Sequence, residues 1–464
     1  MHSPSDPALH VRPEDRGHAV WLRGGAWLGL AALLLALPFV VILAGDPPNA
    51  RGFLHDFAMG VGFAALSLAG MQFALTGRIK PLLHPFGADI VVVFHRFLSW
   101  GLVGLMLVHF GILYIWYQVD LGVLNPLEAA PHMTAGRVAL GCFVLLIVTS
   151  EWRKQIGLDY LWWRRSHVAL ALIGFGAAIW HVLGAGHFTG GDATRILWLA
   201  VTLAWLGLIV WTRVLRPWDQ WRNPWRVTEN RDEGDGVRTL VLAPQGRPLR
   251  GWRPGQFAWL AVGTSPFALR EHPFTISTAP EKGQDLSFSI KALGDDSERL
   301  SETAPGTIAY VDGPYGVFSV DREADADGFV MIAGGVGVTP IIANLRALEE
   351  RRDPRPVTLL YANDSWGDIA FRDELTRIGR TLDLRVVHVI KNPPDDPSIW
   401  PPEDFETREG MIDDALLAEL LPPESRDWPH MLCGPAPMLT AVRRALLGMG
   451  VRRHRIDSEI FEMV

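Results

Sequence analysis

The stretch that decides the fold is VVVFHRFLSWGLVGLMLVHFGIL, residues 91–113, an apolar segment that carries His95 and His109. A second apolar stretch, residues 167–186, carries His167 and His181 at the same separation of fourteen positions. At about 100° per residue, fourteen steps return to within about 40° of the starting direction, so each pair lies on one helix face. The two levels are about 21 Å apart along the axis, which fits within a hydrocarbon core about 30 Å thick.

Equal histidine spacing on two helices predicts two bis-histidine sites, one above the other. Imidazole is costly in lipid unless it has a partner, so these side chains indicate function. The ligand that fits is haem, whose iron accepts an axial histidine on each face. The alternative is four unrelated histidines that pack or snorkel. The shared spacing favours the paired arrangement.

The N-terminal half of the chain around these stretches is strongly apolar. Six stretches are long enough to cross a membrane: residues 20–44, 57–76, 89–116, 134–150, 167–186 and 195–215. The first is longer than a typical signal-peptide core, so we interpret it as a retained span. The glycines between the histidine levels serve either close helix approach or room for a flat macrocycle; they are Gly101, Gly104, Gly174 and Gly176.

Basic residues predict the orientation of the spans. They gather at alternate ends: Arg12, Arg16, Arg23, Arg78, Lys80, Arg153, Lys154, Arg164, Arg165, Arg213 and Arg216. Cytoplasmic loops carry an excess of Lys and Arg, so both termini and the soluble half are expected to be cytoplasmic. His95 and His167 then form the inner pair, and His109 and His181 the outer pair. We expect His55, His84, His132 and His187 to be solvated or to face the headgroups.

The composition excludes several classes of protein. A chain of 464 residues is too long for one domain. A net charge of −7 gives no indication of nucleic-acid binding. The two cysteines, Cys142 and Cys433, are too few for a four-thiolate iron–sulfur cluster and are not expected to form a disulfide.

The soluble half shows two successive patterns. Short alternating runs punctuated by Gly and Pro, from about 225 to 320, predict a small antiparallel barrel. From about 327, apolar strands alternate with helical segments, which predicts a parallel sheet covered by helices. We therefore expect a six-helix transmembrane bundle, an antiparallel β-barrel domain and an α/β nucleotide-binding domain. The predicted bounds are 1–17 for a flexible tail, then 18–217, 222–322 and 326–464.

The segment GGVGVTP, residues 334–340, follows a buried strand and opens a helix. Its glycines let backbone N–H groups approach a pyrophosphate at the helix start. We expect Thr339 to cap the helix and Pro340 to lie in its first turn. The spacing is not the G-x-G-x-x-G fingerprint, so an ordinary glycine-rich turn is the alternative.

Two further segments suggest ligand contacts but are weak signals alone. HPFTIS, residues 272–277, predicts a strand whose edge holds an extended ligand, with Phe274 against a flat ring. GDDS, residues 294–297, places a glycine and a hydroxyl near a helix start. Taken singly, each is explained by ordinary turn chemistry.

Together, HPFTISTAP, IKALGDDSERL, VDGPYG, GGVGVTP and CGPAPM occur in that order after two histidine pairs on the third and fifth spans. This ordered set resembles the NADPH oxidase and ferric reductase family of transmembrane flavocytochromes, over nearly the whole chain past the first twenty residues. The resemblance implies electron flow from cytoplasmic NAD(P)H through FAD and two b-type haems to an outer acceptor, ferric iron or dioxygen.

The resemblance also implies a role for each matching residue. The axial haem ligands are His95, His109, His167 and His181. FAD lies on His272, Pro273, Phe274 and Thr275, with its diphosphate at Gly294 and Ser297. The NAD(P)H diphosphate lies on Gly334, Gly335, Gly337, Thr339 and Pro340. Cys433, Gly434 and Pro435 lie beside the nicotinamide, and Phe461 covers the flavin; Cys433 and Phe461 are the candidate catalytic residues.

The chain departs from the family pattern at two places. Residues 462–464 follow Phe461, whereas the oxidases end on the aromatic residue. Residues 361–368, YANDSWGD, lack the basic residue with which NADPH-preferring members meet the 2′-phosphate, and Arg372 is the nearest substitute. NADH and NADPH therefore both stay open.

The acceptor also stays open at this stage. His132, Arg137 and His187 are candidates to line an acceptor site above the outer haem. Reduction of a separate periplasmic protein is another possibility. A different class of function is a haem-free membrane anchor tethered to a flavin reductase that serves a cytoplasmic partner.

Overall fold

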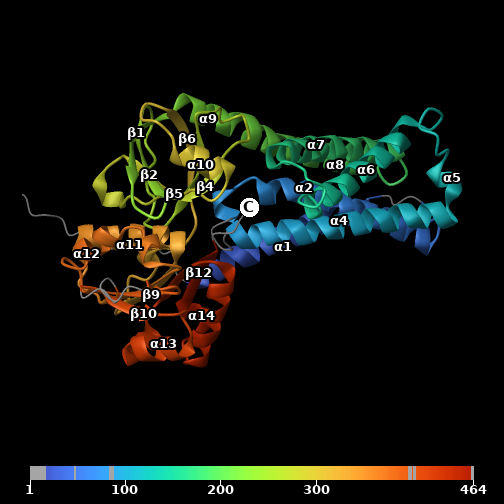
Figure 1. Cartoon of the computed structure of the whole chain (residues 1–464). Helices are drawn as coiled ribbons and strands as arrows, with labels where there is room; N and C mark the ends of the chain where they lie inside the picture. The colour runs from blue at the N-terminus through green and yellow to red at the C-terminus, as the bar shows by residue number, and fades with distance from the viewer. Residues whose placement is uncertain (1–16, 46–48, 83–87, 395–399, 401–403, 461–464) are drawn as a thin grey trace, which may run out of the picture. The chain divides into compact units, whose positions relative to one another are not determined.

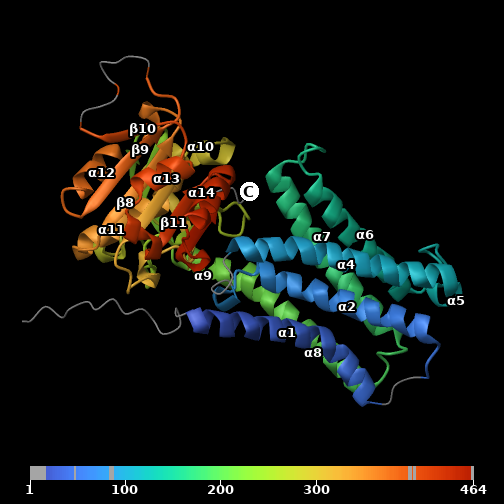
Figure 2. The same ribbon diagram turned by 90° about the horizontal axis from the view of Figure 1, so that it is seen from below.

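The structure is a computed structural model that describes residues 17–45, 49–82, 88–394, 400 and 404–460 (Figures 1 and 2). It divides into two compact units, residues 17–218 and 219–464. The first is helical and the second contains both sheets. We describe each unit separately.

The first unit is a bundle of long apolar helices. They are α1 (Gly17–Ala44), α2 (Phe53–Thr76), α4 (Ala88–Trp116), α6 (Pro131–Glu151), α7 (Tyr160–Ala185) and α8 (Asp192–Val210), with the short α5 (Gln118–Leu121) between α4 and α6. After a π-helical turn at Trp211–Leu215, α8 continues into α9 (Arg216–Arg222). Six of the described helices are long and apolar enough to cross a membrane, which confirms the six predicted spans.

A polar cap extends helix α7 beyond the apolar stretch of the sequence. Helix α7 begins at Tyr160, seven positions before His167, because the Asp159 carboxylate caps it. That carboxylate accepts hydrogen bonds from the backbone N–H groups of Leu161 and Trp162 at 3.0 and 3.1 Å. His167 therefore lies two turns inside its helix.

Within the bundle, α2 packs along α4 and α6 packs along α7, as both views show. The core between the helices includes Phe63, Leu102, Phe143, Phe175 and Trp198. Large apolar side chains on α1, α4 and α8 face outward, as expected of lipid-facing surfaces.

The second unit begins with an antiparallel sheet that curls into a half-barrel. Its strands are β1 (Trp225–Asp232), β2 (Val237–Pro244), β3 (Phe257–Val262), β4 (His272–Thr275), β5 (Leu286–Lys291) and β6 (Ile308–Tyr315), in the order β4-β3-β6-β1-β2-β5. A bridge between Ile276 and Phe288 connects the two edges of the sheet. Helix α10 (Asp295–Ser301) follows β5. The predicted antiparallel domain is confirmed.

The rest of this unit is a parallel sheet covered on both faces. Its strands are β7 (Phe329–Gly334), β8 (Val357–Asn363), β9 (Leu384–Ile390), β10 (Glu406–Glu409), β11 (His430–Gly434) and β12 (Ile456–Ile460), in the order β10-β9-β8-β7-β11-β12. Helices α11 (Val338–Arg351) and α12 (Arg372–Ile378) cover one face; α13 (Asp414–Leu420) and α14 (Ala436–Gly448) cover the other. Every residue of β7 is buried, as expected of a central parallel strand.

Candidate functional site

The four intramembrane histidines meet as two pairs. The ring centroids of His95 and His167 are 6.3 Å apart, and those of His109 and His181 are also 6.3 Å apart. An imidazole nitrogen lies about 2 Å from a transition metal that it binds and about 1 Å from its own ring centre, so two imidazoles on opposite faces of one iron place their centroids about 6 Å apart. Both pairs therefore fit an iron held between them.

Backbone carbonyls orient both imidazoles of the outer pair. The Nδ1 atom of His109 lies 2.8 Å from the Ala58 carbonyl oxygen, and Nδ1 of His181 lies 3.0 Å from the His132 carbonyl oxygen. Because a carbonyl only accepts hydrogen bonds, Nδ1 carries the proton and Nε2 is left to bind a metal.

Two glycines make room for the same imidazoles. A Cβ atom on Gly62 of α2 would lie 3.1 Å from Nδ1 of His109, and one on Gly136 of α6 would lie 2.8 Å from Nδ1 of His181. Helix α2 thus supports the histidine of α4, and α6 supports that of α7. Sequence reasoning did not single out these two glycines, because their role depends on the neighbouring helix.

Side chains support the inner pair. Nδ1 of His167 lies 3.3 Å from the Ser150 hydroxyl, which also accepts a hydrogen bond from Trp163 Nε1 at 3.3 Å. Nδ1 of His95 is buried and has no hydrogen-bond partner among the described residues. Arg96, next to His95, donates two hydrogen bonds to Glu151, at 2.8 and 2.7 Å, and so ties α4 to α6 at this level.

The glycines between the levels serve two purposes. A Cβ on Gly101, Gly104 or Gly176 would meet no atom within 4 Å, whereas one on Gly174 would lie 2.9 Å from Cys142 Cβ. Only Gly174 therefore serves close approach of α7 to α6. The other three border open space, which favours room for a macrocycle.

A cavity surrounds the outer pair. It is partly open to the surroundings, and its lining is mainly apolar. Its polar lining includes His109, His181, Arg137 and His187. Arg137 and His187, two of the candidate acceptor-site residues, thus line this cavity, whereas His132 contributes its carbonyl to the His181 contact.

His55 corrects one sequence prediction. Its side chain is only 2% exposed, so the expectation that it is solvated or headgroup-facing is wrong. It lies between the carboxylates of Asp56, at 3.2 Å, and Asp120, at 3.7 Å, and Arg51 holds Asp120 at 2.8 Å. The acidic residue beside it, Asp56, was the available sequence signal. His84 lies outside the described residues.

The two predicted flavin segments meet in the half-barrel domain. Strand β4, which contains His272, Pro273, Phe274 and Thr275, lies at the end of the sheet order and pairs with β3. Asp296 of α10 accepts hydrogen bonds from Arg270, the shorter at 2.6 Å, and lies 3.4 Å from His272 Nε2. The helix start at residues 294–297 is thereby held against the edge strand.

The hydroxyl of Ser297 belongs to the local turn. It accepts from the backbone N–H of Gly294 at 3.0 Å and donates to the Gly294 carbonyl at 2.8 Å. Gly294 precedes the first residue of α10 and so caps it. These bonds fix the turn at the place where the sequence predicts a flavin diphosphate.

The two dinucleotide motifs also come together. GGVGVTP, which contains Gly334, Gly335 and Gly337, lies at the carboxyl end of β7, and Cys433, Gly434 and Pro435 lie at the carboxyl end of the neighbouring β11. Parallel sheets bind ligands outside the carboxyl ends of their strands. A Cβ on Gly337 would collide with the Cys433 carbonyl, so close contact between the motifs requires glycine there.

The start of α11 differs from the prediction. The helix begins at Val338 with Gly337 as its cap, so the expectation that Thr339 caps it is wrong. The Thr339 hydroxyl instead donates to the Val336 carbonyl at 3.0 Å, inside the short 3-10 turn that precedes the helix. Pro340 lies in the first turn, as predicted.

Cys433 is fully buried in the core of the parallel-sheet domain. Burial, followed by the negative charge of Glu459, raises the pKa of its thiol well above the usual value. The side chain is therefore a neutral thiol that packs, and not a thiolate nucleophile. Phe461 lies outside the described residues; the strand before it, β12, ends at Ile460 beside Gly434.

The end of β8 carries the segment YANDSWGD, in which NADPH-preferring members of the family place a basic residue for the 2′-phosphate. Asn363, the last residue of β8, is 7% exposed. The Arg372 guanidinium lies 5.2 Å from the centre of the Trp366 ring and stacks over it. Arg372 is thus held against an aromatic face near the end of this strand.

Two family models match the chain, one in the helical bundle and one in the parallel-sheet domain. Residues 61–178 match the ferric reductase like transmembrane component, and residues 331–444 match the oxidoreductase NAD-binding domain. The two matches together correspond to a ferric reductase/NADPH oxidase-like architecture. The chain thus joins a ferric reductase like transmembrane region to an antiparallel half-barrel and an oxidoreductase NAD-binding domain.

Individual relatives match about half of the chain. The chain is 28% identical over 253 residues to a flavohemoprotein of Bordetella pertussis, covering 53% of this chain and 61% of that protein. It is 31% identical over 252 residues to the ferredoxin reductase component of a Mycobacterium tuberculosis 3-ketosteroid-9-alpha-monooxygenase, covering 51% and 64%. The chain therefore spans less than two thirds of either relative.

Among solved structures, the FAD/NAD binding domain of a nitric oxide dioxygenase from Vibrio cholerae O1 biovar El Tor aligns with 52% of this chain and 98% of its own. The sequence identity is 27% and the TM-score is 0.42.

Proposed function

We propose that this protein passes electrons from cytoplasmic NAD(P)H, by way of FAD and two b-type haems, to an acceptor on the outer side of the membrane. The observation that carries the proposal is the 6.3 Å separation of both histidine pairs. A haem iron with two axial histidines supplies single-electron transfer and leaves no position for an external ligand.

The chain's own residues hold and orient these groups. His95 and His167 would ligate the inner haem, and His109 and His181 the outer haem. The hydrogen bonds from Nδ1 to Ala58 and His132 direct Nε2 of the outer histidines toward the space between α4 and α7. Gly101, Gly104 and Gly176 leave open space between the levels.

At the reductase end, we propose that the edge strand β4 and residues 294–297 hold FAD. GGVGVTP would bind the NAD(P)H diphosphate through backbone N–H groups at the start of α11. Cys433, Gly434 and Pro435 would pack beside the nicotinamide, with Phe461 over the flavin. The basic loops support a cytoplasmic location for both termini and for this region.

The competing function is a haem-free anchor for a flavin reductase. Such an anchor has no need for four intramembrane histidines, whose cost in lipid is offset only by a partner. Nor does it need glycines at positions 62 and 136 to seat imidazoles. The histidine geometry therefore favours the haem-carrying function.

For the acceptor, we propose ferric iron or a ferric chelate ahead of dioxygen. The transmembrane region matches a ferric reductase like component, which favours metal reduction over superoxide formation. For the donor, we expect NADH to be used at least as well as NADPH. Residues 361–368 contain no cation, and Arg372 stacks on Trp366.

The test is NADH and NADPH oxidation by the purified protein, with oxygen and with a ferric chelate in turn. We expect NADH oxidation that accelerates when ferric chelate is added. Stimulation by oxygen alone, with superoxide formed in proportion, would replace the metal-reductase assignment by an oxidase. Oxidation of neither nucleotide by the FAD-loaded protein would contradict the proposed function.

A further inference from the structure

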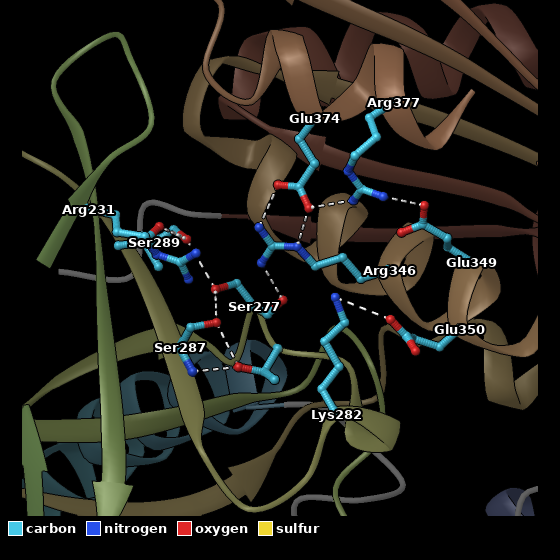
Figure 3. A network of polar contacts seen from close by, with 12 residues as sticks. Arg231, Ser277, Lys282, Ser287, Ser289, Arg346, Glu349, Glu350, Glu374 and Arg377 are labelled. Carbon is cyan, nitrogen blue, oxygen red and sulfur yellow. Dashed lines mark hydrogen bonds and ion pairs between the residues drawn. The ribbon is translucent and has the colours of Figure 1, made fainter. Parts of the chain in front are cut away.

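Helix α11 joins the two halves of the reductase region through one buried arginine. Arg346 lies on this helix, two turns after GGVGVTP, and is only 8% exposed. Its Nη1 atom donates a hydrogen bond of 2.7 Å to the carbonyl oxygen of Ser277 (Figure 3). Ser277 is the last residue of HPFTIS, two positions after β4. A side chain of the nucleotide domain thus holds the backbone of the flavin segment.

The remaining edge of the guanidinium is fixed by Glu374 of α12. Nε and Nη2 of Arg346 donate to the two carboxylate oxygens at 2.9 and 2.6 Å, and the guanidinium lies 5.6 Å from the Phe371 ring centre. Burial acts to raise the pKa of Glu374, but the hydrogen bonds and charge of Arg346, together with the charges of Arg377 and Lys282, outweigh it and lower the pKa. Bidentate pairing of this kind fixes direction as well as charge.

Ser277 is fixed from the opposite side by β5. Its backbone N–H donates to the Ser287 carbonyl at 2.8 Å, and its hydroxyl lies 3.0 Å from the Ser287 hydroxyl and 3.1 Å from the Ser289 hydroxyl. Its side chain is fully buried. Figure 3 shows the segment between the β5 hydroxyls and Arg346. Ser277 is therefore held on both sides. Loss of the Arg346 contact is expected to shift a segment whose position is otherwise fixed.

Other ion pairs join the same domains without touching the flavin segment. Lys282 lies 3.2 Å from Glu350 of α11, and both side chains are more than a third exposed. Such exposed pairs contribute little to stability. The Lys282–Glu350 pair is therefore a matched control for the buried Arg346–Glu374 pair.

We propose that Arg346, oriented by Glu374, is a positioning residue for hydride transfer. Through the Ser277 carbonyl it sets the distance between the flavin segment and the dinucleotide loop. The inference rests on the proposed function, because it assumes FAD at β4 and NAD(P)H at GGVGVTP. In the step concerned, a hydride, which is a hydrogen with two electrons, would pass from NAD(P)H to FAD and give NAD(P)⁺ and reduced flavin. Misplacement by about 1 Å can slow such a step about 100-fold.

The experiment is anaerobic stopped-flow reduction of the flavin by NADH in the detergent-purified, FAD-loaded full chain. Arg346→Lys keeps the charge but cannot serve Ser277 and Glu374 together. We expect its limiting rate of flavin bleaching to fall about tenfold or more, with less than about a twofold change in the apparent Kd for NADH. Lys282→Met should leave both quantities unchanged.

The charge-swapped double variant R346E/E374R separates positioning from folding. It restores an ion pair between α11 and α12 but removes the donor to the Ser277 carbonyl. We expect it to recover thermal stability relative to R346E while flavin reduction stays slow. Recovery of the rate together with stability, or a wild-type rate in Arg346→Lys, would overturn the inference. Failure of both NADH and NADPH to bleach the wild-type flavin would instead overturn the proposed function, and the inference with it.

Discussion

The outer and inner histidine pairs have the same ring separation but different support. In the outer pair, backbone carbonyls of Ala58 and His132 accept from both Nδ1 atoms. In the inner pair, His167 alone has a partner among the described residues, and that partner is the side chain of Ser150. The orientation of the outer imidazoles is therefore set by the close approach of the neighbouring helices. The orientation of His167 in the inner pair depends instead on a side-chain hydroxyl, which a substitution can remove.

The largest expected effect comes from removing one ligand of either pair. His109→Leu is expected to lose the outer haem, because a single axial imidazole does not hold an iron that needs two. Ferric-chelate reduction should fall to background while NADH still reduces the flavin. His95→Leu should have the same outcome through the inner haem. Retention of two haems in His109→Leu would break the assignment of the outer pair.

The next effect comes from the helix contact behind the outer pair. Gly136→Ala would place a Cβ 2.8 Å from Nδ1 of His181, whereas a Cβ on Gly141 of the same helix would meet no atom within 4 Å. We expect Gly136→Ala to lose most of the outer haem and Gly141→Ala to keep both haems, by haem content per FAD. Equal haem contents in the two variants would show that backbone approach does not control the outer level.

A smaller effect is expected from the hydroxyl behind the inner pair. Ser150→Ala removes the partner of His167 Nδ1, which lies at a weak 3.3 Å. The imidazole then donates less electron density, so the midpoint potential of one haem should rise, on the order of tens of millivolts, while both haems are retained. Redox titration followed by absorbance measures this. If the midpoint potential of the inner haem did not change, or if that of the outer haem shifted, the proposed difference in support between the two histidine pairs would be contradicted.

Two buried histidines outside the membrane-spanning helices predict that the stability of the reductase region depends on pH. This effect should not involve either histidine pair in the bundle. Burial lowers the pKa of His388 and of His430 from 6.5 to about 4, with the charge of Arg372 adding to the shift of His388. Between these values the unfolded chain binds protons that the folded chain does not, so the reductase region loses stability as pH falls from 6.5 toward 4. Thermal unfolding followed by flavin fluorescence should show this slope, flattened in His388→Phe. A pH-independent midpoint would contradict it.

Much of the fold was predictable because its signals are local. Apolar length gave the six spans, and the spacing of His95, His109, His167 and His181 predicted which rings meet. The strands Val357–Asn363 and Leu384–Ile390 match apolar runs in the sequence. Strand β1 does not stand out, because its second half is polar and it is held by pairing with β2.

The features that sequence reasoning missed depend on residues far apart in the chain. Gly136 matters only because His181 of the next helix lies against it. Burial of His55 depends on Asp120, which is 65 positions away and approaches within 3.7 Å. Arg346 belongs to an amphipathic helix whose pattern predicts an exposed cation, and only the packing of the half-barrel places the Ser277 carbonyl in reach.

The central claim is that the bundle holds two haems between α4 and α7. It is tested most directly by the haem-to-FAD ratio of the purified protein, from cells grown with ample haem precursor, together with its dithionite-reduced absorption spectrum. We predict two b-type haems per FAD. A protein that shows only the yellow absorption of flavin under these conditions would contradict the account.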